Sequence, residues 1–436
     1  MDTINEIYQL FKQHPNVVTD SRKVAPGCLF FALKGERFNG NYFAASALAD
    51  GAAFAIVDEA VEVPAGKSVQ VDDVLTALQH LATHHRRQFN IPVLAITGSN
   101  GKTTTKELVS AVLVSHYPTH FTKGNLNNHI GVPLTLLSMP AKTEVAIIEM
   151  GANHPGEIDF LCRIAEPTHG LITNVGKAHL EGFGGFEGVK RTKSELYRYL
   201  AERNGLAFIN MDEPFLTELA GGNRLRLFYQ KSESPDPANI PFEVKLVSEV
   251  PFLEAAFLGE NGQWVSVRSQ LIGQYNFSNI MTAIVIGKYF KVPADKIKAA
   301  IESYVPSNNR SQIKAIGTNT FILDAYNANP TSMRMAINSF SKMPGDRKVV
   351  VLGAMKELGE YCGEEHLDIA ILASNSNIDK LVLVGEEFHE AYMATGAVFF
   401  SNTEQLKAWF AAQHFHQTQF LIKGSRSIGL ERLVEP

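Results

Sequence analysis

IPVLAITGSNGKTTT, residues 91–105, is the stretch that decides the fold. Its apolar half, IPVLAI, predicts a buried strand, and its run of a lysine and three threonines predicts the first turn of a helix. A turn bracketed by Gly98 and Gly101 lies between them. Such a turn directs successive backbone N–H groups toward phosphate oxygens at the N-terminus of the following helix. We therefore expect a nucleoside triphosphate site here.

We expect Lys102 to reach the terminal phosphates and the Thr103 hydroxyl to hold Mg²⁺. The spacing differs from the common phosphate loop, which has a glycine five residues before Gly101, where this chain has Ile96. An ordinary strand–turn–helix with a surface lysine is the alternative, and it would not explain the matching residues at a strand end. The expected nucleotide-binding residues of the loop are Gly98, Asn100, Gly101, Lys102, Thr103 and Thr104.

The bulk composition describes an ordinary globular chain. Its 436 residues predict two or three domains, and 45% hydrophobic with 19% charged residues leaves ample material for cores. A net charge of −5 gives no electrostatic argument for nucleic acid or an anionic membrane as partner. The three scattered cysteines show no metal-ligand spacing and favour a reducing compartment. With no signal-like N-terminus and no apolar run of about 20 residues, we expect a cytoplasmic protein.

The pattern of apolar runs predicts an α/β fold in three domains. Residues 1–90 alternate short strands and helices, and the amphipathic stretch LTALQHLATHHRRQF predicts a helix just before Pro92. Residues 91–305 carry the continuous apolar strands of a buried parallel sheet, VLAIT, EVAIIEM, GLIT and LAFIN. Residues 306–436 carry a second set, TFILDAY, KVVVLG, KLVLVG, AVFF and FLIKG, which predicts a doubly wound, Rossmann-like sheet.

One region of the central domain departs from the pattern of continuous apolar strands. Between residues 225 and 270 the alternating stretches FEVKLV and WVSVRS predict a small antiparallel insertion. The Pro/Ser-rich SESPDPANIP within it predicts a loop.

Two side chains near strand ends are candidate metal ligands. Glu149 closes an otherwise apolar strand, and ligands of parallel sheets gather at such carboxyl ends, so a carboxylate there would complete a Mg²⁺ shell with Thr103. A solvated loop glutamate is the alternative. His179 follows another strand end on the same expected edge, although a lone histidine is more often structural.

Asparagines form two further candidate groups. Asn125, Asn127 and Asn128 lie in GNLNNHIGVP, which is either a turn-rich loop or a substrate loop, and the residues alone leave both open. Asn276 and Asn279 lie one helical turn apart and would pair with an adenine edge. Asp324 ends a strand and would bind ribose hydroxyls, whereas helix capping is the alternative for all three.

These stretches together resemble the Mur ligase family of peptidoglycan synthesis. The resemblance spans nearly the whole chain, through TDSRKVAPGCLFFALKGERFNG, TGSNGKTTTKEL, GNLNNHIGVPLTLL, EMGANHPGEI, ITNVGKAHLEGFGGFEGV, RTKSEL, GQYNFSNIMTA, DAYNANPTSM, LGAMKELGE and LIKGSRSIGLE. The shortened phosphate loop is the family's own variant, shared with folylpolyglutamate synthase. The YNANP and GERFNG stretches favour the member that joins D-Ala-D-Ala to a UDP-linked muramoyl tripeptide.

The resemblance implies ATP-dependent amide formation through an acyl phosphate, with Mg²⁺ as the metal. It implies that Lys193, in RTKSEL, is carbamylated and supports a second Mg²⁺ near His179. It also implies that Arg310 approaches the γ-phosphate from the C-terminal domain. The UDP moiety would lie at Ser21 and Arg22, and the loop asparagines would line the route to the reacting carboxylate.

Two positions depart from the family pattern. Tyr275 stands where the adenine motif often has histidine, and Leu323 stands where a second aspartate is common. Neither removes a group assigned to the chemistry.

Three alternatives remain at this point: the ligase that adds the third amino acid, a folylpolyglutamate synthase-like ligase, and a P-loop regulatory ATPase. The N-terminal module argues against the folate enzyme, and the third domain argues against the ATPase. We expect a monomer in which the C-terminal domain closes over the site as on a hinge.

Overall fold

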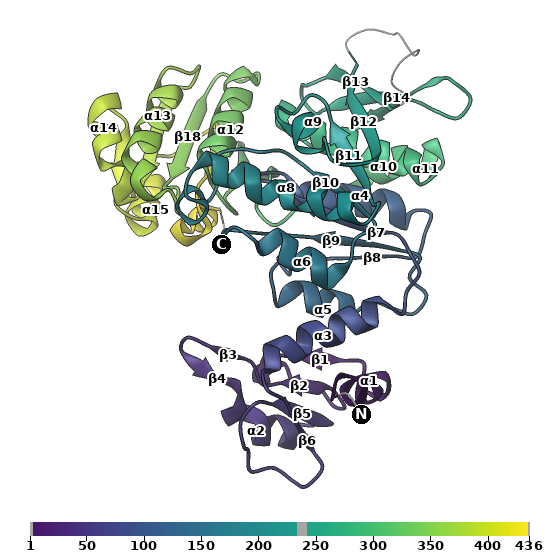
Figure 1. Cartoon of the computed structure of the whole chain (residues 1–436). Coiled ribbons are helices and arrows are strands. Elements are labelled where there is room, and N and C mark those ends of the chain that lie inside the picture. The colour runs from purple at the N-terminus through teal and green to yellow at the C-terminus, as the bar shows by residue number, and fades with distance from the viewer. Residues whose placement is uncertain (1–2, 233–241, 435–436) are drawn as a thin grey trace.

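The computed structural model describes residues 3–232 and 242–434. Three α/β parts follow one another along the chain, each built around its own largely parallel sheet, so the predicted fold class is confirmed (Figure 1). Apart from Ser232, the predicted loop SESPDPANIP lies outside the described residues. Within the described ranges, no helix is long and apolar enough to cross a membrane.

The N-terminal part holds a four-stranded parallel sheet and a small hairpin. The sheet order is β1 (Val17–Val18), β2 (Leu29–Phe31), β5 (Phe54–Val57) and β6 (Ser68–Gln70), and the hairpin is β3 (Lys34–Gly35) with β4 (Phe38–Asn39). The helices are α1 (Thr3–Gln13) and α2 (Ala44–Ala49). The pattern of apolar runs predicts β2, α2 and β5, whereas β1, β3, β4 and β6 are too short to leave a signal.

Helix α3 (Val74–Arg86) joins this part to the next, where a helix is predicted. Asp73 begins it by accepting a hydrogen bond from the Thr76 backbone N–H at 2.7 Å, as an N-cap does. The helix packs against α5 and α6 of the central part. Its buried Arg86 donates to the carbonyl of Ala165 at 3.1 Å. One continuous apolar core therefore underlies both parts.

The central part is a nine-stranded sheet. Its order is β15 (Trp264–Arg268), β14 (Glu254–Leu258), β13 (Glu243–Ser248), β12 (Leu225–Lys231), β11 (Leu206–Asn210), β10 (His169–Ile172), β7 (Val93–Thr97), β9 (Val145–Glu149) and β8 (Thr119–Phe121). Strands β7 to β13 run parallel to one another, whereas the β13–β14 and β14–β15 pairs are antiparallel. The predicted small antiparallel insertion is therefore confirmed for β13 to β15 and wrong for β12, which pairs in parallel. Strand β12 pairs in parallel with both β11 and β13, and its buried residues belong to the same core as theirs.

The helices of the central part cover both faces of this sheet (Figure 1). They are α4 (Lys102–Val114), α5 (Gly131–Leu137), α6 (Glu157–Ala165), α7 (Leu180–Phe183), α8 (Phe186–Glu202), α9 (Leu216–Leu219), α10 (Phe277–Tyr289) and α11 (Ala294–Ser303). Helix α10 is apolar almost all round and packs against α4, so it is buried as such a pattern requires.

The C-terminal part is a six-stranded sheet in the order β16 (Gln312–Ile316), β17 (Asn319–Asp324), β21 (Gln419–Lys423), β18 (Lys348–Gly353), β19 (Lys380–Val384) and β20 (Val398–Phe400). Only the edge strand β16, which the apolar runs do not predict, is antiparallel. The helices are α12 (Pro330–Lys342), α13 (Cys362–Ser374), α14 (His389–Thr395) and α15 (Thr403–Ala411). We propose the borders between the three parts at 90/91 and 305/306, within the connections from α3 to β7 and from α11 to β16.

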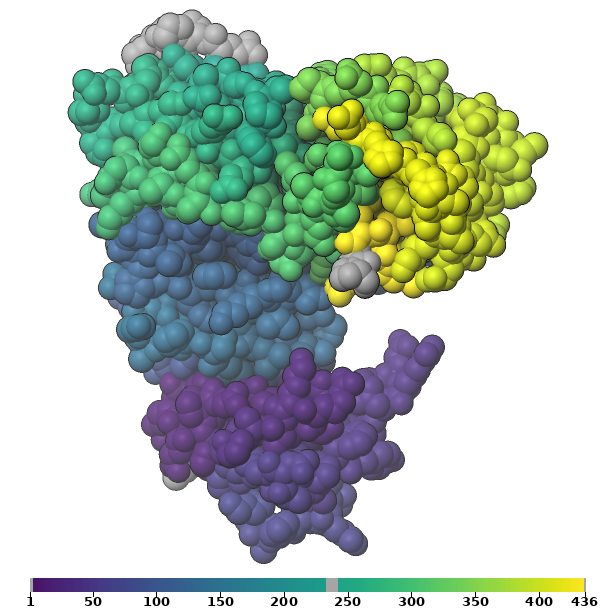
Figure 2. All heavy atoms as spheres, turned by 180° about the vertical axis from the view of Figure 1, so that it is seen from behind, coloured from purple at the N-terminus to yellow at the C-terminus, as the bar shows by residue number. Residues whose placement is uncertain are grey.

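Seen from behind, the C-terminal part packs against the central part, and the N-terminal part lies at the far end of the molecule (Figure 2). An open notch separates the N-terminal and C-terminal parts in this view. The carboxyl ends of the central strands lie beside the C-terminal part, and this arrangement positions the site.

Candidate active site

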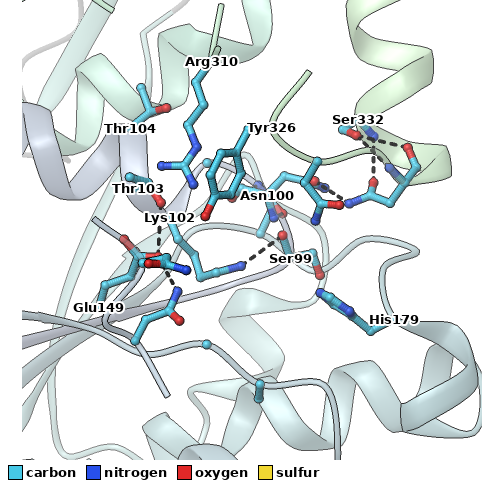
Figure 3. A pocket seen from close by; sticks show the side chains of 18 of the residues that line it. Ser99, Asn100, Lys102, Thr103, Thr104, Glu149, His179, Arg310, Tyr326 and Ser332 are labelled. Carbon is cyan, nitrogen blue, oxygen red and sulfur yellow. Dashed lines mark hydrogen bonds between the residues drawn. The ribbon is translucent and has the colours of Figure 1, made fainter. Parts of the chain in front are cut away.

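One cavity of about 550 Å³ lies between the central and C-terminal parts. Figure 3 shows side chains from both parts pointing into it. The predicted residues that line it are Asn100, Gly101, Lys102, Thr103, Thr104, Asn125, Asn127, Asn128, Glu149, His179, Asn276, Asn279, Arg310 and Asp324. The fold thus brings together groups that are more than two hundred positions apart in the chain.

The phosphate loop has the shape that its two glycines permit. Gly98 has φ +144°, and a Cβ there would lie 2.0 Å from the Thr173 hydroxyl oxygen. Gly101 has φ +78°, and a Cβ there would lie 2.7 Å from Oδ1 of Asn279. Both positions need a residue without a side chain. The Thr173 hydroxyl also donates to the backbone carbonyl of Asn100 at 2.6 Å, which fixes the loop against the end of β10.

Lys102 bends back over this loop. Its Nζ donates to the backbone carbonyls of Gly98 at 2.7 Å and Ser99 at 3.2 Å (Figure 3). Burial lowers the pKa of its ammonium group, and the nearby Glu149 carboxylate opposes that shift. The lysine is therefore held at the loop, where a phosphate would meet both its charge and the helix N-terminus.

Glu149 ends β9 as predicted and is 1% exposed. Its Oε1 accepts hydrogen bonds from the Thr103 hydroxyl at 3.1 Å and from Nδ2 of Asn127 at 2.8 Å. Its Oε2 receives no hydrogen bond from any described residue and lies 3.8 Å from Nζ of the buried Lys106. A buried carboxylate oxygen left open beside a threonine hydroxyl has the donor chemistry that Mg²⁺ prefers, so these residues fit the ion.

Mg²⁺ here would depend on ligands beyond the protein. Within residues 3–232 and 242–434, no group of three His, Cys, Asp or Glu side chains could hold a metal ion. Mg²⁺ in proteins is usually bound by one or two carboxylates together with substrate phosphates and water.

His179 and Lys193 both lie near the ring of Phe183. The His179 ring is 6.2 Å from the Phe183 ring, and its Nδ1 pairs with the Glu357 carboxylate of the C-terminal part. Lys193 on α8 is 1% exposed and does not line the cavity, and its Nζ lies 5.1 Å from the Phe183 ring. Burial and the charge of Lys102 hold the pKa of Lys193 well below its usual range. Burial therefore favours the uncharged form of this amine.

A chain of amides links the phosphate helix to α10. The Thr105 hydroxyl donates to Oδ1 of Asn279 at 2.9 Å, and Nδ2 of Asn279 donates to Oδ1 of Asn276 at 2.9 Å. Tyr275, which stands where the family's adenine motif often has histidine, also lines the cavity. Its hydroxyl forms a hydrogen bond with the Ser311 hydroxyl at 2.9 Å. The predicted adenine residues therefore form one rigid edge.

The C-terminal part supplies the opposite wall. The Arg310 guanidinium lies 3.8 Å above the ring of Tyr326, and both point into the cavity (Figure 3). Asp324 ends β17 as predicted, and its Oδ2 pairs with Nζ of the buried Lys423 at 2.6 Å.

Asn128 has a capping role, since its Oδ1 accepts the backbone N–H of Gly131 at 2.9 Å.

The lining residues that have no role in the sequence-based assignment include Glu213, Tyr326 and Asn329. Tyr326 and Asn329 lie within YNANP, directly after the strand end at Asp324. This position alone could have predicted that they line the site. Glu213 follows the strand LAFIN in the same way.

The predicted UDP residues lie elsewhere. Ser21 and Arg22 belong to a short 3₁₀ turn in the N-terminal part and do not line the cavity. Arg22 is exposed and pairs with Asp20 at 2.9 Å.

Models of known domain families match most of the chain. The Mur ligase family catalytic domain matches residues 15–86, the Mur ligase middle domain residues 96–287, and the Mur ligase glutamate ligase domain residues 309–426. The phosphate loop, Glu149 and Lys193 lie in the second match, and Arg310 and Asp324 lie in the third.

Individual relatives agree over nearly the full length. The chain is 35% identical to the UDP-N-acetylmuramoyl-tripeptide–D-alanyl-D-alanine ligase of Bacillus subtilis, covering 96% of this chain and 92% of that one. The crystal structure of MurF from Acinetobacter baumannii superposes with a TM-score of 0.86 at 30% identity, covering 99% and 97% of the two chains. MurF from Thermotoga maritima in complex with ADP gives 0.83 at 27%, covering 100% and 97%. The chain belongs to the Mur ligase family.

Proposed function

We propose that this chain is an ATP-dependent ligase that joins D-Ala-D-Ala to a UDP-N-acetylmuramoyl tripeptide, releasing ADP and phosphate. The relative from Bacillus subtilis is named for this reaction, and the relative from Thermotoga maritima binds ADP. The observation that carries the proposal is the single cavity in which the phosphate loop and Glu149 face Arg310 and Asp324. A transfer between two substrates needs these groups on opposite walls of one space.

The reaction proceeds in two steps. A terminal carboxylate oxygen of the tripeptide attacks the γ-phosphorus of ATP, and the bond from that phosphorus to the β–γ bridging oxygen breaks, giving an acyl phosphate and ADP. The amine nitrogen of D-Ala-D-Ala then attacks the carbonyl carbon and loses a proton, and the bond from carbon to the phosphate oxygen breaks. Both attacks bring anionic or electron-rich atoms together, so preplaced positive charge lowers the barrier.

Lys102 and Arg310 supply that charge from opposite sides. Lys102 is held at the loop carbonyls, within reach of a β- or γ-phosphate bound at the start of α4. Arg310 arrives from the C-terminal part, with its guanidinium plane stacked on Tyr326 and its orientation thereby restricted. The charge is therefore complete only when the C-terminal part is docked.

Mg²⁺ fits at Glu149 and Thr103, where it would neutralise phosphate oxygens during the transfer. Asn127 orients the Glu149 carboxylate through its hydrogen bond to Oε1. Lys106 balances part of the buried negative charge.

Lys193 is proposed to carry a carbamate. The nitrogen of an uncharged amine attacks the carbon of CO₂, one C–O π bond breaks, and the nitrogen loses a proton, which leaves a carbamate whose negative charge is shared by its two oxygens. Burial lowers the pKa of Lys193 and so favours the neutral amine that this reaction needs. The resulting anion beside Phe183 would join His179 in supporting a second Mg²⁺.

The remaining substrate contacts follow from the length of a UDP-linked peptide. Ser21 and Arg22 would hold the UDP moiety in the N-terminal part, while Asn125, Asn127 and Asn128 guide the peptide end into the cavity. Asn276 and Asn279 would bind adenine, and Asp324 the ribose. We propose that the enzyme works as a cytoplasmic monomer.

The test is an ADP-release assay over a panel of UDP-muramoyl peptides, D-dipeptides and single amino acids. Turnover is expected only when the tripeptide precursor and D-Ala-D-Ala are both present, with a new amide product detected by mass spectrometry. Lys102→Ala serves as the inactive control. Product from a dipeptide precursor and a single amino acid, or from a folate and glutamate, would replace this proposal with one of the related ligases. Steady ATP hydrolysis without either substrate would favour a regulatory ATPase.

A further inference from the structure

Four carboxyl side chains line the cavity, and three of them are already engaged. Glu149 accepts from Thr103 and Asn127, and Asp324 pairs with Lys423. Glu157 accepts the backbone N–H groups of residues 153 and 154 at 2.7 and 2.9 Å. The fourth, Glu213, makes no side-chain hydrogen bond or ion pair with any residue in the described ranges. Glu213 is therefore a hydrogen-bond acceptor in the cavity wall to which the proposed reaction assigns no role.

The strand order places Glu213 at the nucleoside end. It follows β11, which lies two strands from the phosphate-loop strand β7, with β10 between them. Strand β9, which carries Glu149, lies on the other side of β7. Glu213 therefore lies on the side of the phosphate loop opposite to the metal carboxylate. On that side the cavity is lined by Asn276, Ser278 and Asn279 at the start of α10.

The backbone holds Glu213 in place. Its N–H donates to the Asn210 carbonyl at 3.4 Å, and the neighbouring Asp212 N–H donates to Oδ1 of Asn210 at 3.1 Å, which closes a turn directly after the strand. Asp212 faces another way, since its Oδ2 accepts from the Lys231 backbone at 2.6 Å. The turn thus presents the Glu213 carboxyl to the cavity and keeps its neighbour outside.

The charge state of Glu213 suits a site beside a triphosphate. Burial, assisted by the Asp212 carboxylate, raises the pKa of Glu213 to about 7. A carboxyl that is substantially protonated near neutral pH repels the nucleotide less than a full carboxylate, and its carbonyl oxygen still accepts a hydrogen bond.

Hydrogen bonds within the protein already occupy part of the acceptor capacity of the two asparagines. Oδ1 of Asn279 already accepts from Thr105, and Oδ1 of Asn276 already accepts from Asn279. Nδ2 of Asn276 already donates a hydrogen bond to the Ile272 carbonyl at 2.8 Å. The exocyclic amino group of adenine has two N–H donors and requires an acceptor with open lone pairs.

We propose that the Glu213 carboxyl accepts a hydrogen bond from the exocyclic amino group of adenine and makes the site selective for ATP. This inference rests on the proposed function, because it takes the nucleotide and its orientation from that reaction. Glu213 is a specificity residue that touches the base. It takes no part in phosphoryl transfer.

The experiment compares ATP with purine riboside triphosphate, which lacks only the amino group, in the ADP-release assay. Wild-type enzyme is expected to favour ATP by about tenfold in kcat/KM, the usual value of one hydrogen bond to an ionisable group. Glu213→Ala is expected to lose this preference, through a higher KM for ATP at unchanged kcat. Glu213→Gln keeps an acceptor oxygen and is expected to retain most of it. Glu218→Gln, an exposed glutamate on α9 outside the cavity lining, is the matched control.

The outcomes separate the two proposals. If wild-type enzyme forms no amide product with ATP and both substrates, the proposed function is refuted. The adenine contact of Glu213 then loses the reaction on which it rests. If wild-type enzyme is active but Glu213→Ala keeps the full preference for ATP, the role of Glu213 is refuted. An equal loss with both nucleotides also refutes it, because a merely structural role would lower both alike. Thermal melting of each variant checks that the fold is intact.

Discussion

Nδ2 of Asn329 donates a hydrogen bond to Oδ1 of Asn100 over 2.7 Å, although 229 residues separate the two in the chain. Asn100 lies in the phosphate loop, and Asn329 begins α12 of the C-terminal part. The bond therefore ties the nucleotide loop directly to the part that carries Arg310. Beside it, Lys177 pairs with Glu365, and the Thr331 hydroxyl accepts the Lys177 backbone N–H at 3.0 Å. Docking of the C-terminal part is thus coupled to the shape of the phosphate loop.

Asn329→Ser should separate docking from helix capping. Asn329 also caps α12, and serine retains that function, whereas it is too short to reach Asn100. We expect near-normal stability and a KM for ATP raised by about threefold to tenfold, the value of one hydrogen bond. Asn329→Ala should show the same KM and a further stability loss of about 1 kcal/mol from the lost cap. Small-angle scattering with an ATP analogue and substrate should show less compaction in both variants, and unchanged KM values would show that the bond is incidental.

Lys193→Ala should abolish activity. It removes the nitrogen on which the proposed carbamate forms, and the space it leaves is buried, so added formate or acetate should restore part of the activity. Lys190→Ala is the control, because Lys190 lies on the same helix but pairs with Glu187 at 2.7 Å. Removing CO₂ from the buffer should lower wild-type activity only. Full activity of Lys193→Ala would end the carbamate hypothesis.

Glu149→Gln should weaken Mg²⁺ binding. The amide keeps the shape of the side chain but replaces one ligand oxygen and the negative charge that faces Lys106. We expect the Mg²⁺ concentration for half-maximal turnover to rise by about tenfold or more. Glu144→Gln, an exposed glutamate just before the same strand, should leave the Mg²⁺ titration unchanged. Equal titrations for the two variants would place the ion elsewhere.

The half-buried His169 should make stability depend on pH. Burial lowers the pKa of His169 from 6.5 to about 4, where it packs against Tyr289 and Phe208. The unfolded chain then binds a proton as the pH falls below 6.5 while the folded chain does not, so stability is lost between pH 6.5 and about 4. The full loss would be about 3 kcal/mol.

Urea unfolding at several pH values measures this slope. His169→Gln removes the titrating group and should flatten the slope across that window. His80→Gln, at an exposed position on α3, should leave it unchanged. A slope that survives in His169→Gln would assign the effect to other groups.

The sequence-based predictions succeeded where a residue type has one dominant physical use. Continuous apolar runs predicted β7, β9, β10 and β11, since only buried parallel strands tolerate them. The glycines at 98 and 101 predicted the loop, because the backbone there has no room for a Cβ. The predictions failed for β12, whose alternating residues left its pairing direction undetermined, and they did not include the short edge strand β16.

The sequence by itself determined the elements, the phosphate loop and the candidate ligands at strand ends, because these depend on local backbone geometry and on periodic burial. Only the tertiary structure decided which candidates meet. It brought Arg310 and Asp324 to the loop, and it left Lys193, Ser21 and Arg22 out of the cavity lining. It also singled out Glu213, whose open acceptor atoms become visible only when every other carboxyl in the wall has found a partner. Contacts between distant segments depend on how whole parts dock, and no local pattern encodes that arrangement.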